Sequence, residues 1–260
     1  MGIEIQDAYS IISLIKNENF YSKKSLLILG NANIYFDLKS LIRVSEKLNY
    51  QFTFLPKELN VFTFGKFLGF ENVETLDLNG KATLTIDLQE NLSKKMFSKY
   101  DFIIDAGVLF WCFNPGDVLK NIYRMAKKDA LIFHITALSG YFGRGYYNIH
   151  PKLFHDFYLK SNNSSFIQEA YRTKLGISRI HYIFYRILEI FGIRNTYKIN
   201  TFFASGPNNN FLSNTKNRRI IFTNEIQKNE SKYIPNNSIL TFACRKTNTK
   251  EPSDPIQLEC

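Results

Sequence analysis

Short apolar runs alternate with amphipathic stretches over roughly the first 140 residues. Runs rich in apolar or β-branched residues, typical of buried strands, occupy residues 25–29, 73–76, 82–86, 101–105 and 131–135. Apolar residues at helical spacing predict helices over residues 5–20, 35–48 and 118–125. Strands that alternate with helices favour an α/β fold, a doubly wound and mostly parallel sheet with right-handed crossovers.

The pattern is looser in the second half of the chain. It predicts helices over residues 153–159 and 180–193, and strands over residues 200–204, 219–222 and 238–244. The aromatic stretch 52–70 receives no assignment. We expect Lys127, Lys128 and Asp129 to mark the end of the helix before the strand 131–135.

Residues 100–115, YDFIIDAGVLFWCFNP, form the centre of the predicted sheet and its loop. Three apolar residues stand between Asp101 and Asp105, and Ala106-Gly107 then predicts a tight turn. In an open parallel sheet the ligand lies outside the carboxyl ends of the strands, which places residues 105–111 at a binding crevice. An ordinary core strand with its loop is the alternative.

Carboxylates end three predicted strands, at Asp77, Asp87 and Asp105. Such groups accept hydrogen bonds from a ribose or an adenine amino group, although each alone also serves as a helix cap or turn residue. The turn 30–33, GNAN, has one glycine and lacks both GxGxxG and GxxxxGK[ST]. This disfavours a nicotinamide or flavin enzyme and excludes an obvious P-loop NTPase.

Composition and charge narrow the class of protein. The chain is 45% hydrophobic, which predicts a folded globule, and its three cysteines have no metal-ligand spacing, so we expect no metal site. Residues 1–140 carry 16 basic and 15 acidic side chains, whereas residues 141–260 carry 17 and 8. The basic second half indicates an anionic partner or a solvated surface. With charged residues throughout the N-terminus and no span of membrane length, we expect a soluble cytoplasmic protein.

Four blocks in order, ILGNANIYF, FENVETLDLNGKATLTIDL, YDFIIDAGVLFWCFNPGDVLKNIYRM and LIFHITALSGYFGRGYYNIHPKLFHDFY, cover about residues 25–160. Together they resemble small class I methyltransferases that use S-adenosylmethionine and accompany surface-polysaccharide or sugar-nucleotide genes. The resemblance implies one domain over residues 1–250, with a cofactor-binding core at 25–140, an acceptor-side region at 141–246 and a flexible tail at 247–260.

The resemblance also implies roles at the cofactor. Gly30 and Asn31 would line its methionine portion, and Asp77 would bind the ribose hydroxyls. The remaining residues implied at the cofactor are Asp87 and Leu88 at the adenine, and Asp105, Ala106 and Gly107 at the edge of the methyl-donor pocket.

The chain departs from the family where relatives commonly read DGGTLEHVFN. A Glu-His pair has become Phe110-Trp111, and the relatives' HGFYQFSP has become RGYYNIHP at residues 144–151. If the histidine of this pair acts as a base or metal ligand in the relatives, that function is absent at Phe110-Trp111. One interpretation is that this chain has lost methyltransferase activity.

Methyl transfer needs alignment of donor and acceptor, and a base if the acceptor is a hydroxyl. His134 and His150 are the candidate bases, and the alternatives are a core histidine and a turn contact. An acceptor that is already anionic needs no base. We expect Phe110, Trp111, Arg144, Tyr146 and Tyr147 at the substrate, with Arg144 suited to a phosphate.

The predicted function is methyl transfer from S-adenosylmethionine to a small anionic or nucleotide-activated acceptor in capsule or surface-glycan synthesis, with a phosphoramidate as one such acceptor. The alternatives are an RNA methyltransferase, which the basic second half motivates, and a degenerate subunit that binds cofactor without turnover. A homodimer is compatible with the sequence, and a nicotinamide oxidoreductase is the least favoured alternative.

Overall fold

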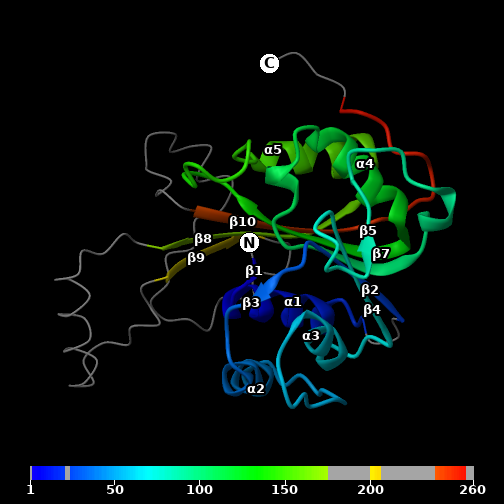
Figure 1. Ribbon diagram of the computed structural model, residues 1–260. Helices are drawn as coiled ribbons and strands as arrows, with labels where there is room; N and C mark the ends of the chain where they lie inside the picture. Colours follow the sequence, from blue (N-terminus) through cyan, green and yellow to red (C-terminus); the bar gives the residue numbers. More distant parts are fainter. Residues whose placement is uncertain (1, 21–23, 175–199, 206–237, 256–260) are drawn as a thin grey trace.

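The computed structural model describes residues 2–20, 24–174, 200–205 and 238–255, and one large sheet organises them (Figure 1). The order of its eight strands is β5-β4-β2-β6-β7-β10-β8-β9. Their bounds in that order are β5 Leu84–Thr85, β4 Asn72–Asp77, β2 Ser25–Leu29, β6 Tyr100–Asp105, β7 Ala126–Ala137, β10 Ser238–Arg245, β8 Ser165–Lys174 and β9 Asn200–Ser205.

The strands from β5 to β7 are parallel, and β10 lies antiparallel between β7 and β8. The chain runs outward from β2 to β4 and β5, then returns to β6 on the other side of β2 and continues to β7. This reversal creates a topological switch point between β2 and β6, at which a crevice opens beyond the carboxyl ends of the strands. The predicted doubly wound, mostly parallel sheet is confirmed.

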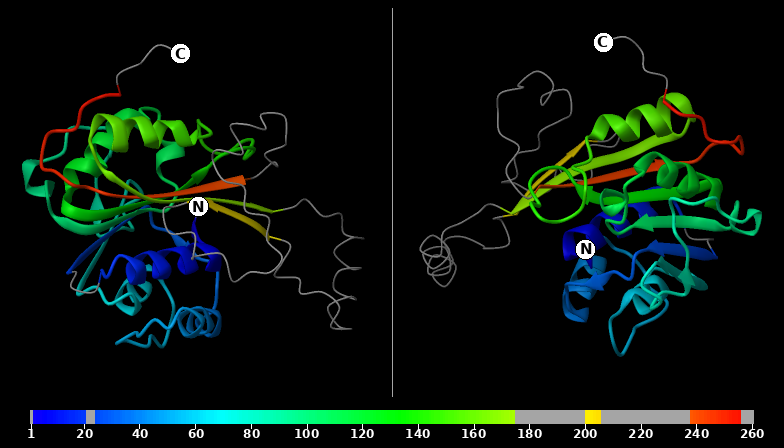
Figure 2. Two further views of the ribbon diagram at one scale, coloured as in Figure 1. Left: turned by 180° about the vertical axis from the view of Figure 1, so that it is seen from behind. Right: turned by 45° about the horizontal axis from the view of Figure 1, so that its top comes forward.

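Helices cover both faces of the sheet, as the turned views make clear (Figure 2). One layer contains α1 Ile5–Asn17, α2 Leu38–Lys47 and α3 Val61–Phe67, with the short strands β1 Gly2–Ile3 and β3 Asn33–Ile34 paired beside it. The other contains α4 Pro115–Met125, α5 Pro151–Phe154 and a π-helix at His155–Ser161, with single 3₁₀ turns at Lys94–Met96 and Leu109–Trp111.

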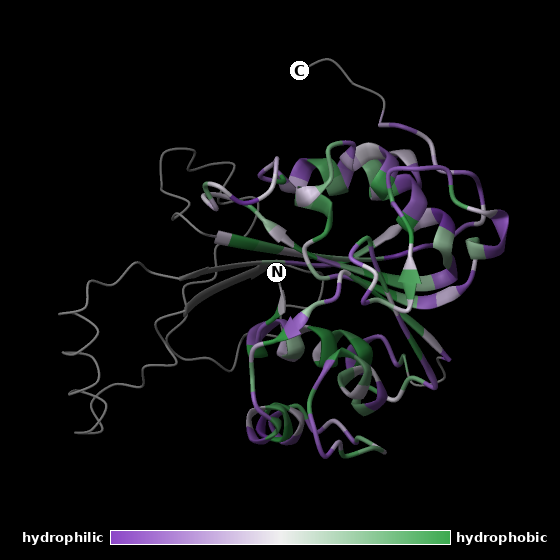
Figure 3. Ribbon diagram, in the orientation of Figure 1, coloured by the Kyte–Doolittle hydropathy of each residue, from purple (hydrophilic) through white to green (hydrophobic). Residues whose placement is uncertain are grey.

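The central strands are largely hydrophobic (Figure 3). Successive side chains of a strand point to opposite faces, so these strands supply core residues to both faces of the sheet. In β2, Leu27 and Leu29 pack into the cluster beneath α4, while Leu26 and Ile28 pack into the cluster beneath α1 and α3. All four are fully buried, and each contributes about 1.5–3 kcal/mol of transfer free energy. The sheet thus forms a rigid frame for the loops at its carboxyl edge.

Several elements differ from the sequence prediction. Lys127, Lys128 and Asp129 do not separate helix from strand, because β7 already begins at Ala126. Lys127 Nζ lies 3.1 Å from Asp101 on the neighbouring strand, an ion pair between strands that sequence spacing cannot reveal. The strand predicted at 82–86 shrinks to Leu84–Thr85, and the unassigned stretch 52–70 contains α3. The sequence pattern did not predict β8, and the predictions at 180–193 and 219–222 lie outside the described residues.

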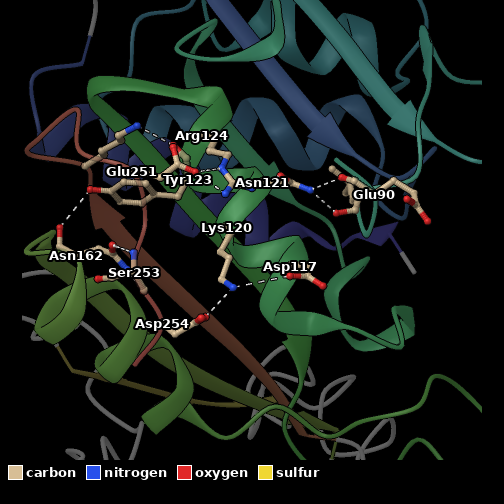
Figure 4. A network of polar contacts seen from close by, with 12 residues as sticks. Glu90, Asp117, Lys120, Asn121, Tyr123, Arg124, Asn162, Glu251, Ser253 and Asp254 are labelled. Carbon is tan, nitrogen blue, oxygen red and sulfur yellow. Dashed lines mark hydrogen bonds and ion pairs between the residues drawn. The ribbon is translucent and has the colours of Figure 1, made fainter. Parts of the chain in front are cut away.

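The segment after β10 was expected to be a flexible tail, but residues 247–255 lie along α4 (Figure 4). Lys120 pairs with Asp254 at 2.8 Å, and Arg124 pairs with Glu251. Asn162 accepts a hydrogen bond from the Ser253 N–H at 2.8 Å. Polar contacts therefore fasten this segment, and residues 256–260 lie outside the described part of the chain. In the described ranges, no helix has the length and apolar character needed to cross a membrane.

Candidate functional site

A cavity of about 270 Å³ opens at the switch point, beyond the carboxyl ends of β2, β4, β5 and β6. Its volume is near the lower end of the range for small-molecule sites, about 300 Å³. Of the residues that the sequence placed at a ligand, the cavity is lined by Gly30, Asn31, Asp77, Asp87, Leu88, Ala106, Gly107 and Trp111. Turns that are far apart in the sequence meet here because parallel strands all end at the same edge.

The turn after β2 brings backbone close to the loop after β6. Gly30 has a φ of +83°, a conformation that side chains disfavour, and a Cβ there would lie 3.1 Å from Val108 Cγ2. The Gly30 N–H donates to the Leu76 carbonyl at 2.7 Å, which joins this turn to β4. The glycine therefore keeps the cavity open between the two turns.

The two strand-end carboxylates that line the cavity also organise their own turns. Asp77 Oδ2 accepts the Asn31 N–H at 2.8 Å, and its Oδ1 accepts the Asn79 N–H at 3.2 Å. Asp87 Oδ1 accepts the Gln89 N–H at 2.9 Å. Each carboxylate keeps further lone pairs, since an ionised carboxylate accepts about four hydrogen bonds. Both groups can hold their turns and still accept hydrogen bonds from a ligand.

Asp105 does not line the cavity, although the sequence placed it there. Its side chain is fully buried beneath the loop that follows β6. Oδ1 accepts the N–H groups of Gly107 at 3.1 Å and Val108 at 2.7 Å, and Oδ2 lies 2.9 Å from His134 Nδ1. Asp105 thus shapes the cavity wall from below, while Ala106 and Gly107 form the wall itself.

His134, predicted as a candidate base, is fully buried in β7. Its Nε2 lies 2.8 Å from the Tyr158 hydroxyl, and its ring stacks on Phe154 at 4.6 Å between centroids. Burial raises the pKa of Tyr158 well above its usual value, so the phenol keeps its proton. Both ring nitrogens of His134 have a hydrogen-bond partner, Asp105 at Nδ1 and the Tyr158 hydroxyl at Nε2. This geometry fits the alternative role of a core histidine, because neither ring nitrogen is free to take a proton from the substrate that receives the methyl group.

His150, the other candidate base, is exposed and begins α5 as its N-cap. Its Nδ1 accepts the Lys152 N–H at 3.1 Å, which satisfies one of the free amides of the first helical turn. The cavity lining does not include His150. The position of His150 fits the alternative stated above, a contact within a turn. The two candidate bases, His134 and His150, do not meet at the cavity.

The residues predicted at the substrate divide into two groups. Phe110 is fully buried, whereas Trp111 is 46% exposed and lines the cavity. Arg144, Tyr146 and Tyr147 are exposed on the loop after β7, outside the cavity lining. This loop joins the cavity region through Phe110, whose carbonyl accepts the Tyr146 N–H at 2.8 Å.

The sequence predicted Val108 at the crevice as part of residues 105–111, but it did not indicate six of the fifteen lining residues. These are Ala32, Leu76, Leu78, Ile86, Gln89 and Cys112. Most stand within two positions of a predicted strand end, and this proximity was the signal that could have found them. Burial, with the nearby carboxylates Asp105 and Asp87, raises the pKa of Cys112 to about 12, so its thiol stays protonated near neutral pH.

No protein-family model and no curated protein matches this sequence, but solved structures resemble its fold. A proposed methyltransferase from Bacillus halodurans has 8% identity and a TM-score of 0.43, and the match covers 90% of this chain and 99% of that one. Burkholderia thailandensis 1,6-didemethyltoxoflavin-N1-methyltransferase, solved with S-adenosylhomocysteine, has 11% identity and a TM-score of 0.40, with coverages of 93% and 79%.

A phosphoethanolamine-type N-methyltransferase from Haemonchus contortus, also solved with S-adenosylhomocysteine, has 13% identity and a TM-score of 0.41, with coverages of 92% and 52%. At these identities and scores the likenesses carry no assignment of activity. The strand order and the two helical layers nevertheless fit the class I methyltransferase fold that the sequence predicted.

Proposed function

We propose that this protein transfers a methyl group from S-adenosylmethionine to a small acceptor. The observation that carries the proposal is the cavity at the switch point, where a one-glycine turn faces two strand-end carboxylates. The donor set suits a nucleoside, since Asp77 can accept from ribose hydroxyls and Asp87 from an adenine amino group. Gly30 and Asn31 would hold the methionine portion, Leu88 would pack on the adenine, and Ala106 and Gly107 would border the methyl group.

The bound cofactor would supply an electrophilic methyl group, and the protein would supply alignment. Within the described residues the cavity lining contains no histidine, and burial and the nearby carboxylates Asp105 and Asp87 keep the pKa of Cys112 at about 12. An acceptor that reaches this site must therefore already be nucleophilic, or must lose its proton to water or to a strand-end carboxylate. This consideration favours the anionic acceptor predicted from the sequence.

A narrower proposal is that the acceptor belongs to capsule or other surface-glycan synthesis, with a phosphoramidate oxygen as one candidate. Its support is the sequence resemblance alone. The cytoplasmic location and the homodimer remain predictions from the sequence.

A second candidate is a subunit that binds the cofactor without turning it over. The observation that favours it is the position of the two predicted bases, with His134 buried and His150 outside the cavity lining. An RNA methyltransferase remains as a third candidate on the charge of residues 141–260. It predicts steeply salt-dependent RNA binding.

Parallel calorimetric titrations with S-adenosylhomocysteine and NAD test the proposal. We expect binding of the former with a stoichiometry of one per chain, and no heat from the latter. Absence of S-adenosylhomocysteine binding would refute both the methyltransferase and the cofactor-binding subunit. Turnover of labelled S-adenosylmethionine with a pool of anionic metabolites then separates these two.

A further inference from the structure

Four aromatic side chains form an exposed surface that begins at the cavity wall. They come from two loops, Trp111 and Phe113 after β6, and Tyr146 and Tyr147 after β7. Their exposed fractions are 46%, 64%, 67% and 39% in that order. We call this group the aromatic shelf. Trp111 lines the cavity and stands two residues before Phe113, so the chain itself connects the cavity wall to the other rings. Exposed aromatic clusters beside a cavity mark ligand-binding surfaces, since single exposed apolar residues do not gather in this way.

The shelf is held in place by its backbone. The N–H groups of Tyr146 and Tyr147 both donate to the Phe110 carbonyl, at 2.8 and 3.3 Å, and the Tyr147 hydroxyl donates to the Phe113 carbonyl at 3.0 Å. Gly145 has a φ of +65°, and a Cβ there would lie 2.3 Å from the Phe110 ring. Only glycine permits the second loop to approach so closely. The aromatic rings are therefore arranged before any ligand arrives, which lowers the entropy cost of binding.

The rings make a corner. Phe113 and Tyr146 have centroids 5.8 Å apart and planes at 89°, so one presents its face where the other presents its edge. A flat aromatic ring that enters such a corner can stack on one ring and meet the edge of the other, the two arrangements that aromatic pairs prefer. The shelf thus suits a planar ring better than an aliphatic chain.

We propose that the aromatic shelf binds the heteroaromatic base of a nucleotide-linked acceptor, whose reactive group then faces the cavity. This inference rests on the proposed function and specifies its acceptor. Arg144, exposed on the same loop and next to Gly145, is the cation that suits the phosphates of such a molecule. The shelf base is distinct from the cofactor adenine, which the proposal places at Asp87 and Leu88 inside the cavity.

Trp111 is the only tryptophan of the chain, so tryptophan fluorescence reports on the cavity wall and the shelf beside it. The protein is first saturated with S-adenosylhomocysteine to fill the cavity, and is then titrated with the 5′-diphosphates of adenosine, guanosine, cytidine and uridine. Ribose 5-phosphate, which lacks a base, is the matched control ligand. We expect at least one nucleotide to change the emission of Trp111 saturably, and ribose 5-phosphate to leave it unchanged.

Variants then locate the binding surface. Phe113→Leu and Tyr146→Leu remove one ring each and should weaken nucleotide binding about tenfold, within the range for loss of one base-stacking partner. Phe62→Leu is the matched control, because Phe62 is 40% exposed on α3, over the opposite face of the sheet. It should leave nucleotide affinity unchanged, and all three variants should bind S-adenosylhomocysteine like the native protein.

The outcomes separate the two proposals. Failure of S-adenosylhomocysteine to bind overturns the proposed function and, with it, this inference. Normal S-adenosylhomocysteine binding with no nucleotide response, or with equal binding of ribose 5-phosphate, overturns the shelf alone. Equal losses in Phe62→Leu and Phe113→Leu would likewise contradict it.

Discussion

The two sides of the cavity are built in different ways. The side formed by β2, β4 and β5 consists of backbone turns and the carboxylates of Asp77 and Asp87, each held by hydrogen bonds to main-chain N–H groups. The other side is formed by the loop after β6. The loop after β7 lies outside the cavity lining and extends this side with exposed aromatic side chains, and its backbone is fixed by the Phe110 carbonyl. The carboxylate side suits a ligand that is recognised by hydrogen bonds, and the aromatic side suits a ligand that is recognised by stacking.

This difference between strand ends and loops explains how one fold can keep the same cofactor site while the molecule that receives the methyl group changes. Strand ends converge at the sheet edge whatever the loop sequence is, so a polar site there is set by the topology. Loops tolerate substitution, and they carry the specificity of many enzymes for that reason. The two sides meet at residues 105–111, and the buried network of Asp105, His134 and Tyr158 supports this junction.

The largest effect should come from breaking that junction. His134→Ala removes the partner of a fully buried carboxylate and the ring that stacks on Phe154, and should lower the free energy of unfolding by about 3 kcal/mol. Tyr158→Phe keeps the ring and removes only the hydroxyl, so about 1 kcal/mol is expected. Urea unfolding measures both.

A catalytic role for His134 predicts a different pattern. In that case His134→Gln and Tyr158→Phe would abolish or shift the pH profile of turnover with little change in stability. We expect the opposite, with the loss appearing in the unfolding midpoint.

The next effect concerns the polar side alone. Asp77→Ala should weaken S-adenosylhomocysteine binding at least tenfold, because it removes a ribose acceptor and frees the Asn31 N–H. Asp77→Asn keeps an oxygen for Asn31 but loses a lone-pair site and the charge. If Asp77 acted only on the turn, the asparagine variant would bind like the native protein. Calorimetry distinguishes these results.

Asp37→Ala is the matched control for loss of a carboxylate. Asp37 is the N-cap of α2, and its Oδ1 accepts the Ser40 N–H at 2.7 Å. Loss of the cap should lower the free energy of unfolding slightly and leave S-adenosylhomocysteine affinity unchanged. Weaker binding in this variant would show that the affinity loss is a general effect of removing charge.

The smallest expected effect is on the reactivity of the Cys112 thiol, which lies between the carboxylate side and the aromatic side of the cavity. Because burial and then the charges of Asp105 and Asp87 raise the pKa of Cys112 to about 12, its thiolate fraction should increase about tenfold per pH unit from pH 7 to 11. In a Cys260→Ser variant, labelling of Cys112 by iodoacetamide should follow that slope, whereas an ordinary thiol levels off near pH 9. Peptide mass spectrometry measures the rate, and S-adenosylhomocysteine should slow it. A plateau near pH 9 would contradict the raised pKa.

Local pattern was sufficient for the polar side of the site. Residues 25–29 form β2 as predicted, and β4 and β6 end at Asp77 and Asp105, the carboxylates that the sequence predicted at their ends. Strands of one parallel sheet end at one edge, so these ends could be expected to meet. The sequence therefore determined the fold class and most of the residues at the proposed cofactor cavity.

Tertiary structure alone decided what the remaining side chains do. His134 and Tyr158 are 24 residues apart and become partners only when the π-helix packs on β7, so the predicted base His134 lies buried between two partners. The Asp105 side chain points into the protein, where it accepts hydrogen bonds from N–H groups of its own loop and contacts the buried His134. The aromatic shelf likewise depends on the close approach of Gly145 to Phe110. The contacts of His134 with Asp105 and Tyr158, and of Gly145 with Phe110, join residues far apart in the sequence, so local spacing does not predict them.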